Sequence, residues 1–235
     1  MNARSALLLG LSIALGLAAA AWMHARGALE ARMLDRSVTV KGLAEREVAA
    51  DVVIWPIRFT AADNELEALY ERLQADTAKV EKFLLAAGIE RTAISTAPPA
   101  VTDKFAQAYG SGETASLRFV ANRSVTVHTN RIEAVQKAMQ NALELGRQGV
   151  TLSGDFDSRP LYLYTKLNEL KPGMVESATK EARAVARKFA DDSDSRLGKI
   201  RRAWQGQFSI EDRDQNNPQI KRVRVVSTIE YYLSD

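Results

Sequence analysis

The hydrophobic pattern of the chain changes twice along its length. From Ser5 to Met23, nineteen residues pass without a charge. A helix of that length spans roughly 28 Å, close to the thickness of the hydrocarbon core of a bilayer. From Val38 apolar and polar residues alternate as in a half-exposed strand, and from Leu66 apolar residues recur at the three- and four-residue spacing of an amphipathic helix. The pattern predicts an apolar N-terminal segment, residues 1–36, followed by one α+β domain, residues 37–235.

The apolar run has two interpretations. It is longer than the core of a signal peptide, and helix-compatible residues continue through Arg36, which favours an uncleaved membrane anchor. Ala19 to Ala21 also form a small-residue cleavage motif before Trp22, which leaves a cleaved signal peptide open. We therefore expect residues 5–23 to hold a periplasmic domain at the inner membrane, with a soluble periplasmic protein as the alternative. The flanking charges do not decide the orientation.

Period-two patterns predict strands. The first runs from Val38 to Lys41 and is closed by Gly42, and the second runs from Val48 to Phe59, with Pro56 indicating a bulge or an edge. Further strands are expected at residues 89–101, 117–129, 150–156, 161–167, 199–210 and 219–233.

Three segments have helical periodicity. Asp63 or Asn64 caps the first and Gly88 ends it, Gly146 ends the second, and the third starts behind Pro172. The residues expected on their inner faces are Leu66, Leu69, Tyr70, Leu73, Thr77, Val80, Phe83, Leu84 and Ala87, then Ile132, Val135, Met139, Ala142 and Leu143, and finally Val175, Ala178, Ala182, Val185 and Phe189. Because several strand pairs are joined by short turns, we expect these helices to pack on a mixed, largely antiparallel sheet.

Composition narrows the function classes. The chain has 32 basic and 29 acidic residues and no cysteine. The absence of cysteine excludes disulfides, thiolate metal sites and a cysteine nucleophile. A charge this balanced argues against nucleic acid as a partner, because phosphate binding needs clustered cations.

Three stretches together resemble the SIMPL family of bacterial envelope proteins. They are VTVKGLAEREVAADVVIWPIRF (Val38 to Phe59), RSVTVHTNRIEAVQKAMQNALELG (Arg123 to Gly146), and the alanine-spaced helix from Val175 to Ala190 that leads into LGKI (Leu197 to Ile200). The chain departs from the family pattern at DDSDSR, residues 191–196. The resemblance implies an exported α+β domain, often periplasmic, oligomeric in some members and linked in general terms to envelope or oxidative stress. It implies no catalytic residues.

The two histidines and one acidic segment are the candidate sites for metal binding or triad chemistry. His24 lies at the end of the apolar run, and His128 lies in a predicted strand without sequence neighbours that would complete a triad or a metal site. Asp212, Asp214 and Asn216 have the first spacings of a calcium loop. The glycine and glutamate that such a loop requires are replaced by Asn217 and Val223, which favours a solvated turn.

Three further groups have simple structural interpretations. Asp155 and Asp157 are interpreted as a solvated strand end rather than as paired catalytic carboxylates. Residues 110–112 lack the strand-to-helix context of a phosphate loop. A basic patch that protects an edge hairpin is expected from Lys199, Arg201, Arg202, Lys221, Arg222 and Arg224.

The sequence thus offers no catalytic, cofactor-binding or metal-binding residue. We expect a non-enzymatic envelope protein that associates with itself or with another envelope protein. The alternative is a periplasmic enzyme of hydrolase type whose polar groups converge only in three dimensions.

Overall fold

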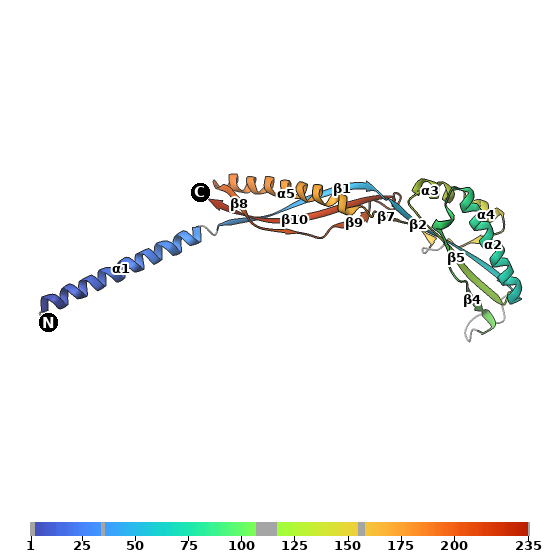
Figure 1. The fold of residues 1–235 in the computed structure, drawn as a ribbon, viewed down its shortest axis with the longest axis horizontal. Helices are drawn as coiled ribbons and strands as arrows, with labels where there is room; N and C mark the ends of the chain where they lie inside the picture. The colour runs from blue at the N-terminus through green and yellow to red at the C-terminus, as the bar shows by residue number, and fades with distance from the viewer. Residues whose placement is uncertain (1–2, 34–35, 107–116, 155–157, 235) are drawn as a thin grey trace. The chain divides into compact units, whose positions relative to one another are not determined.

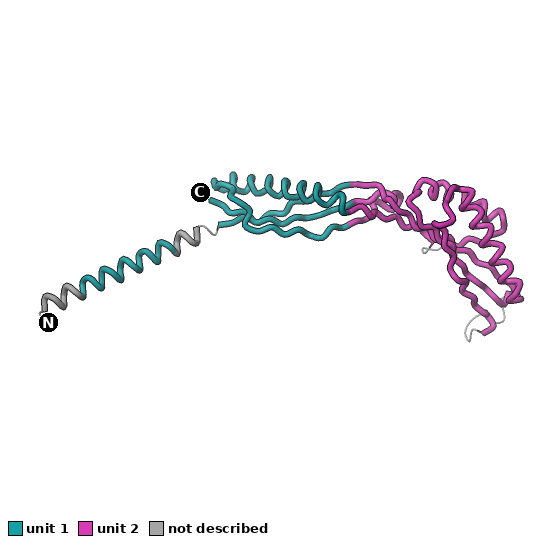
Figure 2. Tube along the Cα trace, viewed as in Figure 1, with its two compact units in different colours: residues 1–46, 168–209, 223–235 teal, residues 47–167, 210–222 magenta. Residues whose placement is uncertain are grey.

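The computed structural model describes residues 3–33, 36–106, 117–154 and 158–234, with side chains at 10–27 only within the first of these ranges. It confirms the α+β class with antiparallel strand pairing (Figure 1). The chain divides into two compact units (Figure 2). Unit 1 comprises residues 1–46, 168–209 and 223–235, and unit 2 comprises residues 47–167 and 210–222.

Helix α1 spans Ala3–Met33. All of its described side chains, at residues 10–27, are exposed. Within the stretch of chain that the structure describes, no helix is both long and apolar enough to cross a membrane.

In unit 1 the helix α5 (Leu167–Asp192) packs on a sheet with the strand order β1-β10-β8. The strands are β1 (Ser37–Ala49), β8 (Arg196–Gln205) and β10 (Ile220–Ser234), and β9 (Ser209–Asp212) also pairs with β10.

The prediction that Gly42 ends the first strand is wrong, because β1 continues to Ala49. A Cβ at Gly42 would overlap the Ala178 carbonyl oxygen and lie 2.6 Å from the Ala182 nitrogen. Glycine therefore stands inside the strand because the backbone of α5 passes directly over it.

Helix α5 also differs from the prediction. It starts five residues before Pro172, which lies inside its first turns. The buried stripe has a strict four-residue period and consists of Met174, Ala178, Ala182, Ala186 and Ala190. Phe189, predicted to be internal, is 56% exposed, because small residues rather than large ones permit the close approach of this helix to the sheet.

Unit 2 contains the second sheet, with the order β3-β5-β2-β6. Its strands are β2 (Val52–Asp63), β3 (Ile94–Thr96), β4 (Ala100–Asp103), β5 (Phe119–Thr129), β6 (Thr151–Leu152) and β7 (Leu161–Leu163). β4 pairs with β5, and β7 pairs with β2. The pairing of β2 with β5 is continuous through Pro56, so the bulge predicted there is wrong. The predicted edge is confirmed locally, because Pro56 falls between the segments of β2 that pair with β7 and with β6, where its missing N–H costs no ladder bond on that side.

The core of unit 2 lies between this sheet and the helices α2 (Leu66–Ala86), α3 (Ile132–Gln140) and α4 (Leu143–Arg147). Short 3₁₀ turns lie at Arg91–Ala93, directly before β3, and at Lys104–Ala106, directly after β4. Alternate residues of β2, among them Trp55 and Phe59, face the buried side, as do Val125 and Val127 of β5. The predicted first helix is confirmed, but Leu66 and Tyr70, predicted on its inner face, are 43% and 48% exposed. The predicted cap differs, since the N-cap residue is Glu65 and Asp63 Oδ1 accepts the N–H of Asn64 and Glu65.

Two helices of unit 2 end in the same motif. In α2 the N–H of Gly88 donates to Leu85 O and that of Ile89 to Leu84 O, and Gly88 has φ +84°. In α4 the N–H of Gly149 donates to Gly146 O and that of Val150 to Leu145 O, with φ +85° at Gly149. Both are Schellman motifs, in which a buried pair, Leu84 with Ile89 or Leu145 with Val150, fixes the helix end.

The second predicted helix is therefore wrong in two respects. It breaks at residues 141–142 into α3 and α4, and Gly149 rather than Gly146 terminates it. After the break the inward phase changes, so that Leu145 is buried and the predicted core residue Leu143 is 79% exposed.

Candidate functional site

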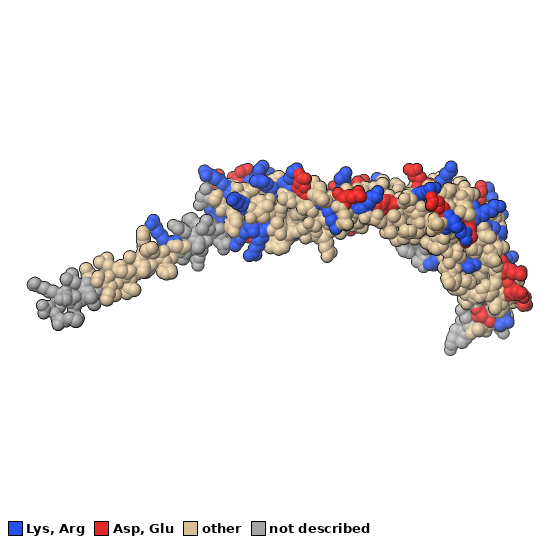
Figure 3. All heavy atoms as spheres, viewed as in Figure 1, with Lys and Arg blue, Asp and Glu red and all other residues tan. Residues whose placement is uncertain are grey.

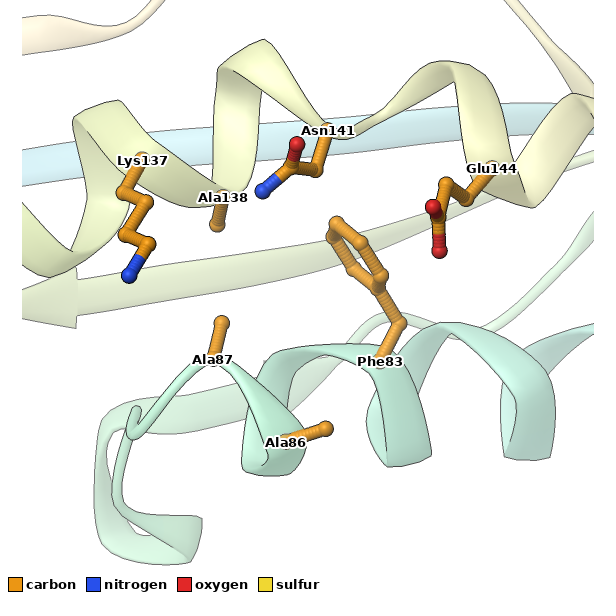
Figure 4. Close-up of a pocket in the computed structure, with 7 residues that line it drawn as sticks. All are labelled: Phe83, Ala86, Ala87, Lys137, Ala138, Asn141 and Glu144. Carbon is orange, nitrogen blue, oxygen red and sulfur yellow. The ribbon is translucent and has the colours of Figure 1, made fainter.

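A groove of about 310 Å³ lies in unit 2 between α2 and the α3–α4 pair, and it is called here the α2–α3 groove. Figure 4 shows the end of α2 on one side and α3, the break and α4 on the other. Its lining consists of Phe83, Ala86, Ala87, Lys137, Ala138, Asn141 and Glu144. The groove exists because alanines occupy the facing positions, where larger side chains would close the space.

One arginine braces the two walls. The Nη1 of Arg131, at the N-terminal end of α3, donates to the carbonyl oxygen of Gly88 at 3.1 Å, directly after α2. Its Nη2 forms an ion pair with Glu90 Oε1 at 2.6 Å. The Schellman motif that ends α2 thus presents a carbonyl that ties α2 to the start of α3.

The groove combines an apolar floor with a polar rim. In Figure 4 the ring of Phe83 points into the space near Asn141 and Glu144, while Lys137 lies at the opposite end near Ala87. A cation at one end and a carboxylate at the other suit a ligand that is apolar in its middle and carries opposite charges at its flanks.

A second hollow, of about 580 Å³, lies at the start of α3. It is lined by Ala49, Ala50, Asn130, Arg131, Ile132, Glu133, Ala134, Gln136 and Gln219. The residue after Ala50, Asp51, accepts hydrogen bonds from the N–H and the hydroxyl of Thr165, both at 2.9 Å. This aspartate is engaged in holding β2 against the segment after β7.

His128 lies in a shallow hollow of about 340 Å³ that is also lined by Glu90, Thr92 and Asn130. Its side chain is exposed, and Glu90 is paired with Arg131. Among the described residues, no group of three His, Asp or Glu side chains is placed to hold a metal ion. His24 is exposed on α1.

The predicted solvated turn at residues 211–218 is a side-chain-capped turn. Asp214 Oδ1 accepts the N–H of both Asn216 and Asn217 at 2.9 Å, and Asp214 Oδ2 accepts Arg213 Nε at 2.9 Å. The hydrogen bond from Arg213 lowers the pKa of Asp214 to about 2, and those from Asn217 and Asn216 add to the effect. Its carboxylate is occupied by the chain itself, and Asp212 is paired with Lys221.

The predicted basic patch is divided by ion pairs. Arg201 pairs with Glu230 at 3.1 Å, Arg224 with Glu45 at 3.5 Å, and the buried Lys221 with Asp212. Lys199 and Arg202, by contrast, are exposed on β8. The candidate residues 110–112, 155 and 157 lie outside the described residues.

The described groups whose pKa is displaced are not among the residues that line these three hollows, although Tyr162 has a hydrogen bond with Gln136 of the second. Hydrogen bonds lower the pKa of Asp103, Glu176 and Glu230, with Arg118, Lys180 and Ser37 as their respective donors. Burial raises the pKa of Tyr162 and Tyr231. Both effects belong to surface pairs and core packing.

Sequence reasoning missed the α2–α3 groove. Its alanines carry no chemical signal, and of its lining residues the sequence pattern identifies only Phe83 and Ala87, both as core residues. The available signal was the pair Ala86-Ala87 at the end of α2, where a helix facing a second helix would otherwise present larger apolar side chains.

A family model matches most of the chain. The SIMPL family, described as a protein family of unknown function (DUF541), matches residues 38–228. No curated protein matches the chain.

Proposed function

Since the chain belongs to the SIMPL family, we propose that it is an exported cell-envelope protein, held at the inner membrane by its N-terminal helix, that acts by binding a partner. One observation supports the proposed location at the membrane. Large apolar side chains of α1 are 54–69% exposed, and they are Leu11, Ile13, Leu15, Leu17, Trp22 and Met23. A helix that is apolar on all its faces requires an apolar environment.

Two features of the N-terminus support a membrane environment. The uncharged run begins at Ser5, ahead of the described side chains, and so is longer than the part seen in the structure. At its other end the guanidinium of Arg26 lies 4.4 Å from the centre of the Trp22 ring. Tryptophan with a neighbouring cation is typical of the boundary between membrane and water.

Fractionation tests the location. We expect the protein in the membrane pellet after alkaline extraction, with an intact N-terminus by mass spectrometry and a domain that protease digests from the periplasmic side. A soluble form beginning near Trp22 would replace the anchor with a cleaved signal peptide. A membrane-bound form protected from periplasmic protease would overturn export.

The α2–α3 groove supports the binding role. Its apolar floor between Lys137 and Glu144 fits a protein segment with an apolar side chain flanked by an acidic and a basic residue. Such a segment belongs either to a second copy of the chain or to another envelope protein. The SIMPL resemblance favours both over a small-molecule substrate.

Photo-crosslinking in cells tests this role. A benzoylphenylalanine at Asn141, on the groove rim, is expected to give a discrete adduct that mass spectrometry identifies as a second copy or an envelope protein. The matched probe at Lys82, exposed on α2 but outside the lining, should give none. Equal patterns from both positions would contradict a role for the groove.

A link to envelope or oxidative stress stays a prediction from the family resemblance. It requires that a strain lacking the protein lose viability under peroxide or membrane-perturbing agents. It also requires that the intact chain restore viability. Unchanged survival of the strain lacking the protein would contradict the link to stress.

A further inference from the structure

We propose that the end of unit 1 nearest α1 is a docking surface for anionic phospholipid headgroups. The surface, called here the basic collar, consists of Arg36, Arg183, Arg187, Lys188, Arg196, Lys199, Arg201 and Arg202. This inference rests on the proposed membrane location and adds to it a preference for anionic lipid.

The positive charge of the protein is concentrated in this collar. Residues 183–202 hold seven of the 32 basic residues and only three of the 29 acidic residues, Asp191, Asp192 and Asp194. This segment therefore has a formal charge of +4, whereas the whole chain has +3. Figure 3 shows lysine and arginine gathered at this end of unit 1.

Cations lie on both sides of the strand β8. Arg202 pairs with Glu230 and Arg196 with Ser234 in the strand register, which places these arginines on the sheet face opposite α5. On the helix side, Arg183 and Arg187 lie close enough to influence the Tyr231 hydroxyl electrostatically. The charge therefore surrounds an edge rather than lining a pocket.

Most of the collar is available to an external anion. Of its members, Arg201 is engaged by Glu230, and Arg36 Nη2 donates to Ser195 Oγ at 3.1 Å. In the described part of the chain, no ion pair is formed by the other six, which are Arg183, Arg187, Lys188, Arg196, Lys199 and Arg202. All six are exposed.

Exposed apolar and aromatic side chains stand among the cations. Ile200 is 49% and Trp204 50% exposed on β8, and Tyr232 lies with its ring centre 5.6 Å from the guanidinium carbon of Arg201. Amphipathic aromatic residues beside cations are the composition of protein surfaces at the headgroup layer. An acidic protein partner would also suit these side chains, but the proposed membrane location of α1 favours the headgroups.

The chain itself keeps the collar close to α1. The Arg36 carbonyl accepts the N–H of Leu233 at 2.9 Å, which fixes Arg36 to the end of β10. Arg36 follows Met33, the last residue of α1, by three residues, a span of at most about 11 Å. The helical residues 24–33, beyond the uncharged run, add about 15 Å. A tilt of α1 therefore suffices to lay the collar on the headgroups of the membrane that holds it.

The absence of native cysteine allows a site-specific test with the full chain. An environment-sensitive fluorophore is placed at Ala203→Cys on β8, and a matched one at Gln148→Cys in unit 2, both exposed positions. The protein is mixed with neutral phosphatidylcholine vesicles, or with vesicles in which phosphatidylglycerol is a third of the lipid. Flotation measures association, and a headgroup-borne spin label that quenches the fluorophore measures contact of the collar.

We expect quenching at residue 203 to rise about threefold or more with phosphatidylglycerol and to fall again in high salt, because headgroup attraction is screened. The variant K199Q/R202Q should lose most of this rise. The matched variant K82Q/R147Q removes two exposed cations from unit 2 and should keep it. Quenching at residue 148 should not depend on the lipid.

The outcomes separate this inference from the proposed anchor. Flotation with neutral vesicles but equal quenching at residue 203 in both lipids would overturn the collar and leave the anchor. Flotation only with phosphatidylglycerol would support the collar and remove the anchor. Flotation with neither would overturn both.

Discussion

In each unit a helix covers one face of a sheet, but the side chains at the contact are large in unit 2 and small in unit 1. In unit 2, α2 covers its sheet with large side chains, and Phe59, Leu69, Leu73 and Leu84 are almost fully buried. In unit 1, α5 covers its sheet with a stripe of alanines over Gly42. A core of large side chains derives stability from buried apolar area, whereas an alanine–glycine contact depends on close backbone approach. The two units should therefore respond differently to changes in side-chain volume.

Loss of volume should affect unit 2 most. Phe59→Ala removes a fully buried ring and is expected to lower the free energy of unfolding of unit 2 by about 4 kcal/mol, within the range of 3–5 for such changes. In unit 1 the corresponding loss, Ala182→Gly, should cost only about 1 kcal/mol, chiefly through helix propensity. Hydrogen exchange followed by mass spectrometry reports each unit separately. Equal losses would show that unit 1 also depends on buried volume.

A gain of side-chain volume should instead destabilise unit 1 most. Gly42→Ala places a methyl group against the backbone of α5 and is expected to destabilise unit 1 by about 3 kcal/mol, since backbone cannot move aside as a flexible side chain can. The control is Gly173→Ala in α5, where a Cβ meets nothing within 4 Å. That change should be neutral or stabilising by up to about 1 kcal/mol. A tolerated alanine at residue 42 would refute the close-contact account of β1.

The packing contrast also explains which parts of the fold were predictable. Helix α2 follows from its own sequence, because its period and Gly88 lie within one segment. The course of β1 does not, since the reason for Gly42 is Ala178, more than a hundred residues later in the chain. Local hydrophobicity likewise predicts Phe189 on the inner face, whereas the sheet contacts a stripe made mostly of alanines.

The groove was unpredictable for a related reason. Gly146 and Gly149 are equally able to end a helix locally, and the burial of Leu145 against Val150 selects the second. That selection breaks the predicted helix and turns Leu143 outward. The α2–α3 groove, with Asn141 at the break and alanines facing it, therefore depends on tertiary packing that no single segment encodes.

Two buried tyrosines extend the comparison to polar groups. Tyr162 in unit 2 has a hydrogen bond with Gln136, whereas the buried hydroxyl of Tyr231 in unit 1 has no partner among the described residues. Tyr162→Phe should therefore cost about 1 kcal/mol, and Tyr231→Phe should be neutral or slightly stabilising. Chemical denaturation of both variants, read in each unit by hydrogen exchange, checks the difference. A clear loss at Tyr231 would reveal a partner for its hydroxyl.

The smallest expected difference is in the acid response. The Asp214 carboxyl of unit 2 has a pKa of about 2, below its ordinary 3.8, because of the hydrogen bonds from Arg213 and Asn217. A folded-state pKa below the unfolded value contributes stability that is present above about pH 3.8 and is lost as the pH falls toward 2. In unit 1 the Ser37 hydroxyl lowers the pKa of Glu230, so its contribution disappears in the same direction, starting from its ordinary 4.5. Titration by NMR should show Asp214 as the more acidic of the two. Asp214→Asn should reduce the loss of stability of unit 2 at low pH and leave that of unit 1 unchanged. An unshifted Asp214 would mean that its capped turn opens in solution.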